Sequence, residues 1–382
     1  MNRQNVARYH PDRPRTASPA WSGGKLDTVP VPSSSLRSRI RSIAAGYPEL
    51  IAVLAAAVLG LTVQRPLAWL AGHQGISVLL AILVFATAIT IDPAALRRLV
   101  SAWRSLVAAL VVGVTVLPAL SWAVSRIVTA GSLRDGVLVV GLAPCEIASV
   151  ATTAMAGGEA AVSAGVLIGS TVAAVALAGP ILTLEAGRAG ISPGGIISNL
   201  ALVVALPLAL GLAARACAEA PARSRFPSAR TSAQAAAGDG REPAPCRLLA
   251  AARVLSTPRA ERVASQTALA AVAALVALIA SEVRLSTAYL AVAAALLLFL
   301  LGSALVGRAL GTRAARPTAT ALLLTTSMRD FAIAAGLAAA AFGPAAAAPL
   351  GLYGVAVLVW GTAVAGALRH RTRTAKQNST PI

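Results

Sequence analysis

The sequence predicts an all-α integral membrane protein with ten transmembrane helices, arranged as a five-plus-five inverted repeat. Three observations support this fold class. Of the 382 residues, 57% are hydrophobic and only 12% are charged, whereas soluble domains carry roughly 25% charged residues. Long uncharged windows reach the ~20 residues that a membrane-spanning helix needs. The charges that do fall deep inside such windows occur in only two of them.

Uncharged windows between the charged segments define the ten predicted spans in chain order. The seventh is the shortest of them. The spans are predicted at 49–70, 74–92, 102–128, 134–156, 159–183, 192–214, 265–281, 286–307, 316–342 and 345–368. Since an odd number of helices in each half inverts the second copy in the membrane, two sets of five favour an inverted repeat with a central binding site.

The remaining segments are polar and form tails and a linker. Residues 1–47 are rich in Pro, Ser and Arg and have no early apolar stretch, which favours a disordered cytoplasmic tail over a signal peptide. The transporter domain is predicted over 48–370. A disordered cytoplasmic linker, 215–264, interrupts it, and 371–382 form a cytoplasmic tail.

The placement of Lys and Arg predicts the orientation in the membrane. With a cytoplasmic N-terminus, most of the 33 basic residues lie in cytoplasmic loops and tails, which is the positive-inside pattern. The opposite side receives only Arg65, Arg126, Arg134, Arg188 and Arg284. Both termini are therefore predicted to be cytoplasmic. The net charge of +19 does not indicate nucleic-acid binding, because the basic residues flank predicted spans and are not interleaved with aromatic residues.

Charged residues inside the membrane mark the candidate site. The fourth span carries Pro144, Cys145 and Glu146, and the ninth carries Arg329 and Asp330. A charge at the bilayer centre costs about 2.5–3.5 kcal/mol on insertion scales, so such residues pair or face a wet cavity. We expect Glu146 to pair with Arg329 where the two spans cross, either as part of the site or as a structural latch. Pro144 is expected to interrupt the fourth span, because it removes a backbone donor.

The other candidates are weaker individually. Cys145 alone in an apolar segment is more often packing material than a ligand. Hydroxyl residues in the same spans usually bond to their own helix or to a neighbouring one. The candidate binding residues among them are Ser149, Thr153, Ser163 and Thr325. No catalytic residues, metal site or cofactor are predicted, and the oligomeric state is left open.

Several motifs resemble the bile acid:sodium symporter family. ILVFATAITIDPAALRRL in the second span resembles an apolar segment of that family. APCEIASVATTAMAGGEAAVSAGVLIGSTVAAVALAGP in spans four and five is similar to its signature, and SMRDFAIAAGLAAAAFG resembles its second crossing helix. The resemblance covers about 45–370 apart from the linker. It implies a core domain and a panel domain, broken crossing helices 4 and 9, and sodium-coupled uptake of organic anions.

The resemblance also implies sodium ligands, and the sequence departs from most of them. Ser149 and Ser163 match ligand serines of the family. Val150 stands where the family has asparagine, and Leu167 where it has threonine. The acidic ligand position falls at Thr325.

Two further departures concern amide ligands. The amide position of the ninth span falls at Arg329, and that of the third span falls near Gly113. We therefore expect the Arg329 guanidinium to replace a bound sodium ion, held by Glu146 or Asp330. The sequence then predicts a secondary transporter of a small organic anion. The departures from the sodium ligands favour uniport or proton coupling. Na⁺, which the resemblance implies, and H⁺ are the candidate coupling ions.

Other functions stay open. Arsenite permeases are similar in fold and carry a cysteine in the fourth helix, so efflux of arsenite or another metalloid through Cys145 is an alternative. A non-transporting membrane sensor would be expected to carry a folded signalling domain, and an intramembrane enzyme would need a base beside a nucleophile such as Ser149. Abundant Arg and Ala with two lysines, Lys25 and Lys376, favour a bacterial protein in the plasma membrane.

Overall fold

The computed structural model describes residues 48–90, 102–186, 192–219, 258–283 and 286–378. The predicted N-terminal tail and most of the linker lie outside this part of the chain. Within it, regular structure is helical apart from one isolated β-bridge. The β-bridge lies between the fourth and ninth predicted spans, so the one departure from helix coincides with the candidate site.

Helices lie at every predicted span. The first five spans correspond to α2 (Pro48–Thr62), α4 (Ile76–Thr90), α6 (Trp103–Ser125), the pair α7 (Gly131–Val139) and α8 (Ala148–Met155), and α9 (Ala160–Ala186). The next five correspond to the pair α10 (Pro193–Leu200) and α11 (Leu206–Glu219), α14 (Pro258–Ser281), α15 (Ala288–Leu310), the pair α16 (Arg316–Ser327) and α17 (Phe331–Phe342), and α18 (Ala348–Asn378).

Seven helical stretches of the described residues are long and apolar enough to cross a membrane. They establish a multi-pass membrane protein. The helix at the predicted first span, α2, is shorter than these seven stretches. The predicted fourth and ninth spans are each divided into two short helices. Ten crossings and the inverted repeat therefore remain predictions. The linker follows the sixth predicted span, so it does not mark the boundary between two sets of five.

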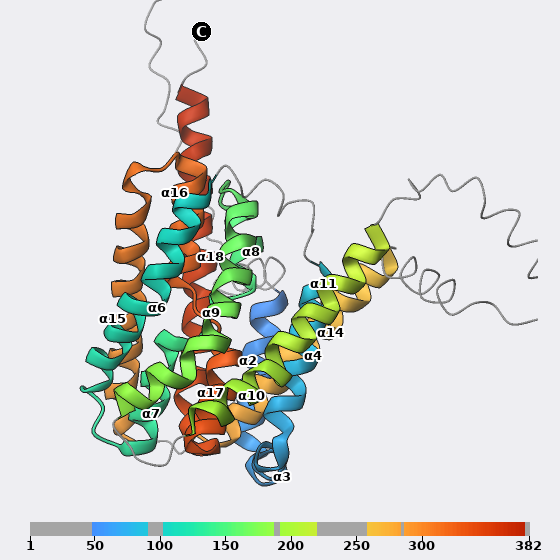
Figure 1. Cartoon of the computed structure of the whole chain (residues 1–382), viewed down its shortest axis with the longest axis vertical. Coiled ribbons are helices and arrows are strands. Elements are labelled where there is room, and N and C mark those ends of the chain that lie inside the picture. The colour runs from blue at the N-terminus through green and yellow to red at the C-terminus, as the bar shows by residue number, and fades with distance from the viewer. Residues whose placement is uncertain (1–47, 91–101, 187–191, 220–257, 284–285, 379–382) are drawn as a thin grey trace, which may run out of the picture. The chain divides into compact units, whose positions relative to one another are not determined.

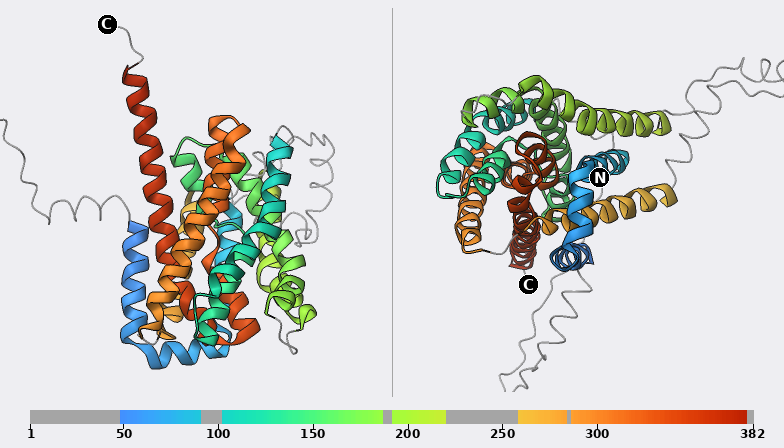
Figure 2. Two further views of the ribbon diagram at one scale, coloured as in Figure 1. Left: turned by 90° about the vertical axis from the view of Figure 1, so that its left-hand side faces the viewer. Right: turned by 90° about the horizontal axis from the view of Figure 1, so that it is seen from below.

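Three predicted boundaries are wrong. The first span was expected to be continuous over 49–70, but Val63 leaves helical geometry (φ −109°, ψ 54°) and separates α2 from α3 (Gln64–Leu70). Figure 2 shows α3 lying across the end where α2 and α4 meet. The seventh span is not short, since α14 begins at Pro258. The last helix continues to Asn378, because no proline or glycine ends it in the polar segment after the membrane span.

The helices pack in two groups. In the first, α14 lies against α2 and α4, and α11 also packs on α4 (Figure 1). In the second, α6 packs on α9 and α15, and α16 packs on α15, α9 and α8. The helix α18 contacts members of both groups. Both interrupted spans have helices in the second group, and the panel and core domains that the family resemblance implies stay a prediction.

Gly60 allows the close approach of α2 and α14. A Cβ at this position would lie 2.3 Å from the carbonyl oxygen of Ala277 and 2.7 Å from the Cβ of Ala280. Because small residues let membrane helices pack closely, Gly60→Ala is expected to destabilise the fold by about 1–3 kcal/mol. The melting temperature of the purified protein measures this effect. Gly366→Ala is the matched control, since a Cβ there meets nothing within 4 Å; equal melting of the two variants would contradict the packing argument.

Candidate functional site

The two interrupted spans cross at their non-helical segments. The first gap follows a 3₁₀ turn, Val140–Leu142, and ends where α8 begins at Ala148. The second lies between Ser327 and Phe331. The two extended segments pair as an antiparallel bridge, in which the Glu146 N–H donates to the Met328 carbonyl (2.8 Å) and the Asp330 N–H donates to the Pro144 carbonyl (2.9 Å). The bridge thus satisfies backbone groups that the helix breaks leave free.

The bridge divides the side chains between two faces. Cys145 and Arg329 are directly opposite each other and lie on the same face. Because successive side chains of an extended segment alternate, Glu146 and Asp330 lie together on the other face. The expected ion pair of Glu146 with Arg329 is therefore wrong: among the described residues, no ion pair joins Arg329 to either carboxylate. Residue spacing along a span does not predict this arrangement, because the two segments that cross are paired extended chains and not helix faces.

The Arg329 side chain extends toward α6 and α9. Only 3% of the residue is exposed, and its Nε has no hydrogen-bond partner within the described structure. A Cβ built on Gly113 of α6 would lie 3.8 Å from Nη1 of Arg329, an ordinary contact distance, so the guanidinium lies directly beside this position. The backbone N–H of Arg329 donates to the Tyr353 hydroxyl (3.3 Å). Tyr353 is fully buried in α18, and nothing in its apolar sequence context singled it out.

The carboxylates lie at the start of two helices. Asp330 caps α17 by accepting a hydrogen bond from the Ile333 N–H at 2.8 Å. The Glu146 carboxylate lies against the backbone N–H groups of Phe331, Ala148 and Ile147, at the starts of α17 and α8. Helix N-termini carry partial positive charge and favour such groups. One oxygen of Glu146, Oε2, is nevertheless buried without a hydrogen-bond partner in the described chain.

The remaining predicted site residues are buried, and their hydroxyls are mostly engaged with the protein. Ser163 donates to the Thr153 hydroxyl (2.8 Å), and Thr325 donates to the Ala321 carbonyl one turn earlier (2.8 Å). Ser149 lies with its Oγ 4.0 Å from the Cys145 sulfur. The bridge therefore brings Pro144, Cys145, Glu146, Arg329 and Asp330 together. Their role in binding stays a prediction, as does that of the four hydroxyl residues.

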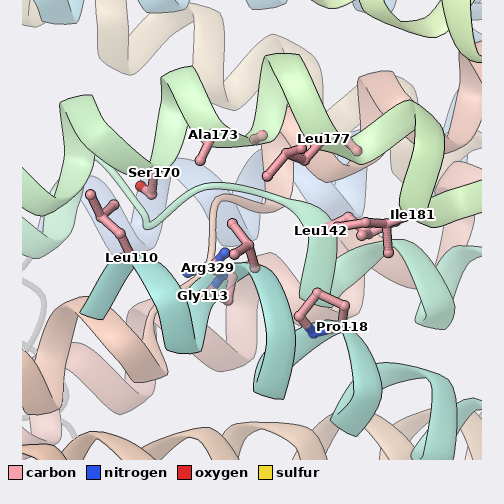
Figure 3. A pocket seen from close by; sticks show the side chains of 12 residues that line it. Leu110, Gly113, Pro118, Leu142, Ser170, Ala173, Leu177, Ile181 and Arg329 are labelled. Carbon is pink, nitrogen blue, oxygen red and sulfur yellow. The ribbon is translucent and has the colours of Figure 1, made fainter. Parts of the chain in front are cut away.

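A pocket lies between α6 and α9, with Arg329 at its wall (Figure 3). Apart from Arg329 and Ser170, its lining consists of apolar side chains, alanines and one glycine: Leu110, Gly113, Val114, Pro118, Leu142, Ala173, Ala174, Leu177, Ala178 and Ile181. Ser170 accepts a hydrogen bond from the Cys145 N–H (3.1 Å) and donates to the Leu167 carbonyl. Arg329 is therefore the only charged side chain that lines this pocket.

A second cleft lies where the two helix groups meet. Its residues come from α4, α9, the α10–α11 segment and the starts of α8 and α17. They are Val84, Thr87, Ile147, Leu167, Thr171, Val204, Leu208 and Ile333. This cleft is apolar apart from two threonines. In the part of the chain that the structure describes, no three His, Cys, Asp or Glu side chains gather as they would around a metal ion.

Broken helices that meet in the interior of a multi-pass membrane protein, with charges at the crossing, are typical of secondary transporters. Residues 77–228 match the model of the Sodium Bile acid symporter family. This match supports the resemblance of the motifs to the bile acid:sodium symporter family, over the stretch that contains α4 through α11. Proteins of this family are transporters and not enzymes. No curated protein matches the chain.

Proposed function

We propose that this protein is a secondary active transporter of a small organic anion across the plasma membrane. The crossing of α7–α8 with α16–α17 carries this proposal, because it holds Glu146, Arg329 and Asp330 buried among apolar helices. Intramembrane charges are costly and are retained mainly for function. The match to the symporter family supports the transport class, and the buried guanidinium supports an anionic substrate.

The apolar cleft between the two helix groups is the proposed place for the body of the substrate. Its lining is mainly Val, Leu and Ile, with Thr87 and Thr171 as polar groups. Binding sites of this kind hold an apolar ligand body and orient it with few polar contacts. An organic acid with a hydrocarbon portion fits this lining better than a sugar or a polyvalent inorganic ion would.

We further propose that transport does not require sodium. Arg329 stands at a position where the family has an amide ligand, and its guanidinium lies beside Gly113, where a second amide is expected. The buried side chains of Leu167 and Thr325 stand at two other ligand positions. Of the two sodium-independent modes, proton coupling is favoured over uniport by Glu146, whose buried Oε2 has no partner within the described residues.

Thermal stabilisation of the purified protein tests the substrate class. The melting temperature would be measured with a panel of organic acids and with neutral amides or esters of the same carbon skeletons. We expect one or more acids to raise the melting temperature in a saturable way, since a ligand that binds only the folded state stabilises it. The neutral analogues are expected to have no effect. Equal stabilisation by acids and neutral analogues would argue against an anion transporter.

The metalloid alternative depends on Cys145. Its thiol is fully buried, with the Ser149 hydroxyl 4.0 Å away. One thiol offers a single soft ligand for As(III). We expect cells that express Cys145→Ala to have the same arsenite sensitivity as cells that express the wild type at matched protein levels. A clear difference between them, absent for Ser149→Ala, would favour the metalloid permease instead.

The proposed location is the bacterial plasma membrane, with both termini in the cytoplasm. The distribution of Lys and Arg supports the orientation. The C-terminal helix α18 also supports this orientation, because the helix continues past the apolar span into the basic segment RHRTRTAK.

A further inference from the structure

The Arg329 guanidinium is a buried cation without a counter-charge in direct contact. Its neighbours in the chain, Met328 and Asp330, point to the opposite face of the bridge together with Glu146. Asp330 is close enough to act on Arg329 through space, but its carboxylate is engaged by the Ile333 N–H. An unpaired charge in a protein interior is strongly unfavourable, so a counter-charge is expected at the guanidinium.

No acidic side chain lines the space in front of the guanidinium. The pocket between α6 and α9 is lined by Arg329, Ser170 and otherwise by apolar or small residues (Figure 3). Ser170 already accepts one hydrogen bond and donates another. Gly113 lies beside Nη1 and offers no side chain that could bond to it. The guanidinium is thus the strongest donor that faces the pocket.

We propose that the pocket between α6 and α9 is a binding site for one small monovalent anion, held by the Arg329 guanidinium. The anion is a carboxylate or free chloride; both present a single negative charge to the same donors. This pocket shares no lining residue with the cleft between the helix groups, so a substrate carboxylate would occupy it at a different step of transport from the one in which the cleft holds the body of the acid. A guanidinium binds a carboxylate through two parallel hydrogen bonds. The apolar walls lower the local dielectric around the guanidinium, which strengthens such an interaction.

This inference deepens the proposed function and rests on it where the anion is the substrate. The anion site itself does not require transport, so the two can fail separately. Binding that depends on Arg329 without uptake of any acid would leave the site standing and remove the transporter. Equal uptake of an acid by wild type and Arg329→Gln would leave the transporter standing and remove the anion site.

The test measures melting of the full-length purified protein in sulfate buffer at constant ionic strength. Chloride or acetate is titrated against wild type, Arg329→Gln, Arg329→Lys and Arg126→Gln. Arg126 is an exposed arginine that stacks on Trp122 and serves as the matched control. We expect saturable stabilisation by at least one of the two anions in wild type and Arg126→Gln. In Arg329→Gln the apparent affinity should be about ten- to a hundredfold weaker.

The variants also separate the sources of the anion. If the site takes the substrate carboxylate, acetate stabilises, chloride competes with it, and uptake of the acid proceeds in chloride-free sulfate. If it takes free chloride, chloride stabilises and uptake requires it. Arg329→Lys keeps the charge and retains part of the response, so a folding defect in Arg329→Gln does not leave the result ambiguous. No stabilisation of wild type by either anion, or equal stabilisation of wild type and Arg329→Gln, would overturn the proposal.

Discussion

Replacing Arg329 with glutamine is expected to reduce uptake of the organic acid at least about tenfold, since a charge-assisted hydrogen bond contributes roughly 1.5–3 kcal/mol. Glutamine keeps a polar side chain of similar reach but loses the positive charge that faces the pocket between α6 and α9. Nothing else that lines this pocket is charged. Uptake of the labelled acid into proteoliposomes measures the effect.

The backbone role of position 329 should survive this substitution. Its N–H bonds to Tyr353, and the flanking residues form the bridge to the fourth span, whatever the side chain is. Arg329→Gln should therefore be purified as a folded protein, and Arg329→Lys should recover part of the uptake, because it restores the charge without the planar, bidentate geometry of guanidinium. Wild-type uptake by the glutamine variant would remove Arg329 from the mechanism.

A second large effect is expected for Glu146→Gln, which should keep exchange of the acid but lose its accumulation. We propose that Glu146 accepts the coupling proton. Its Oε2 is buried without a partner in the described structure, and Asp330 on the same face is already committed to the cap of α17. The glutamine side chain is neutral at every pH, so it mimics a glutamate that stays protonated. A carrier locked in this form can exchange one substrate molecule for another but cannot return empty after releasing a proton.

Two measurements separate these steps: exchange of labelled for unlabelled acid without a gradient, and uptake driven by an inwardly directed proton gradient. Glu185→Gln is the matched control, because Glu185 in α9 also has a buried Oε2 without a partner in this part of the chain. It is expected to behave as the wild type does. Gradient-driven accumulation by Glu146→Gln at the wild-type level would show that the proton is carried elsewhere.

Much of the helical layout could be predicted from the sequence, because hydrophobic length alone fixes where a membrane helix lies. The uncharged windows marked all ten helical regions, and Pro144 marked the break in the fourth span. No comparable signal marks the break in the ninth, where MRD contains no proline or glycine. That break was inferred only from family resemblance, and it persists because the bridge to Pro144 and Glu146 satisfies its backbone.

The partners of the charged residues could not be predicted in the same way. Spacing along a span indicates which residues share a helix face, but Glu146 and Arg329 lie on paired extended segments, where alternate residues face opposite sides. A crossing of unbroken helices would permit their ion pair; the bridge prevents it. Tyr353 was missed because one tyrosine in an apolar span carries no positional signal, and its contact with Arg329 depends on how α18 packs on the core.

The central claim is that a fixed guanidinium, rather than bound sodium, supplies the positive charge for transport of an organic anion. Uptake of a stabilising acid into proteoliposomes, with sodium replaced by potassium on both sides and the proton gradient held constant, tests it most directly. We predict equal initial rates in the two cations and loss of uptake in Arg329→Gln in both. A saturable requirement for sodium would contradict the account.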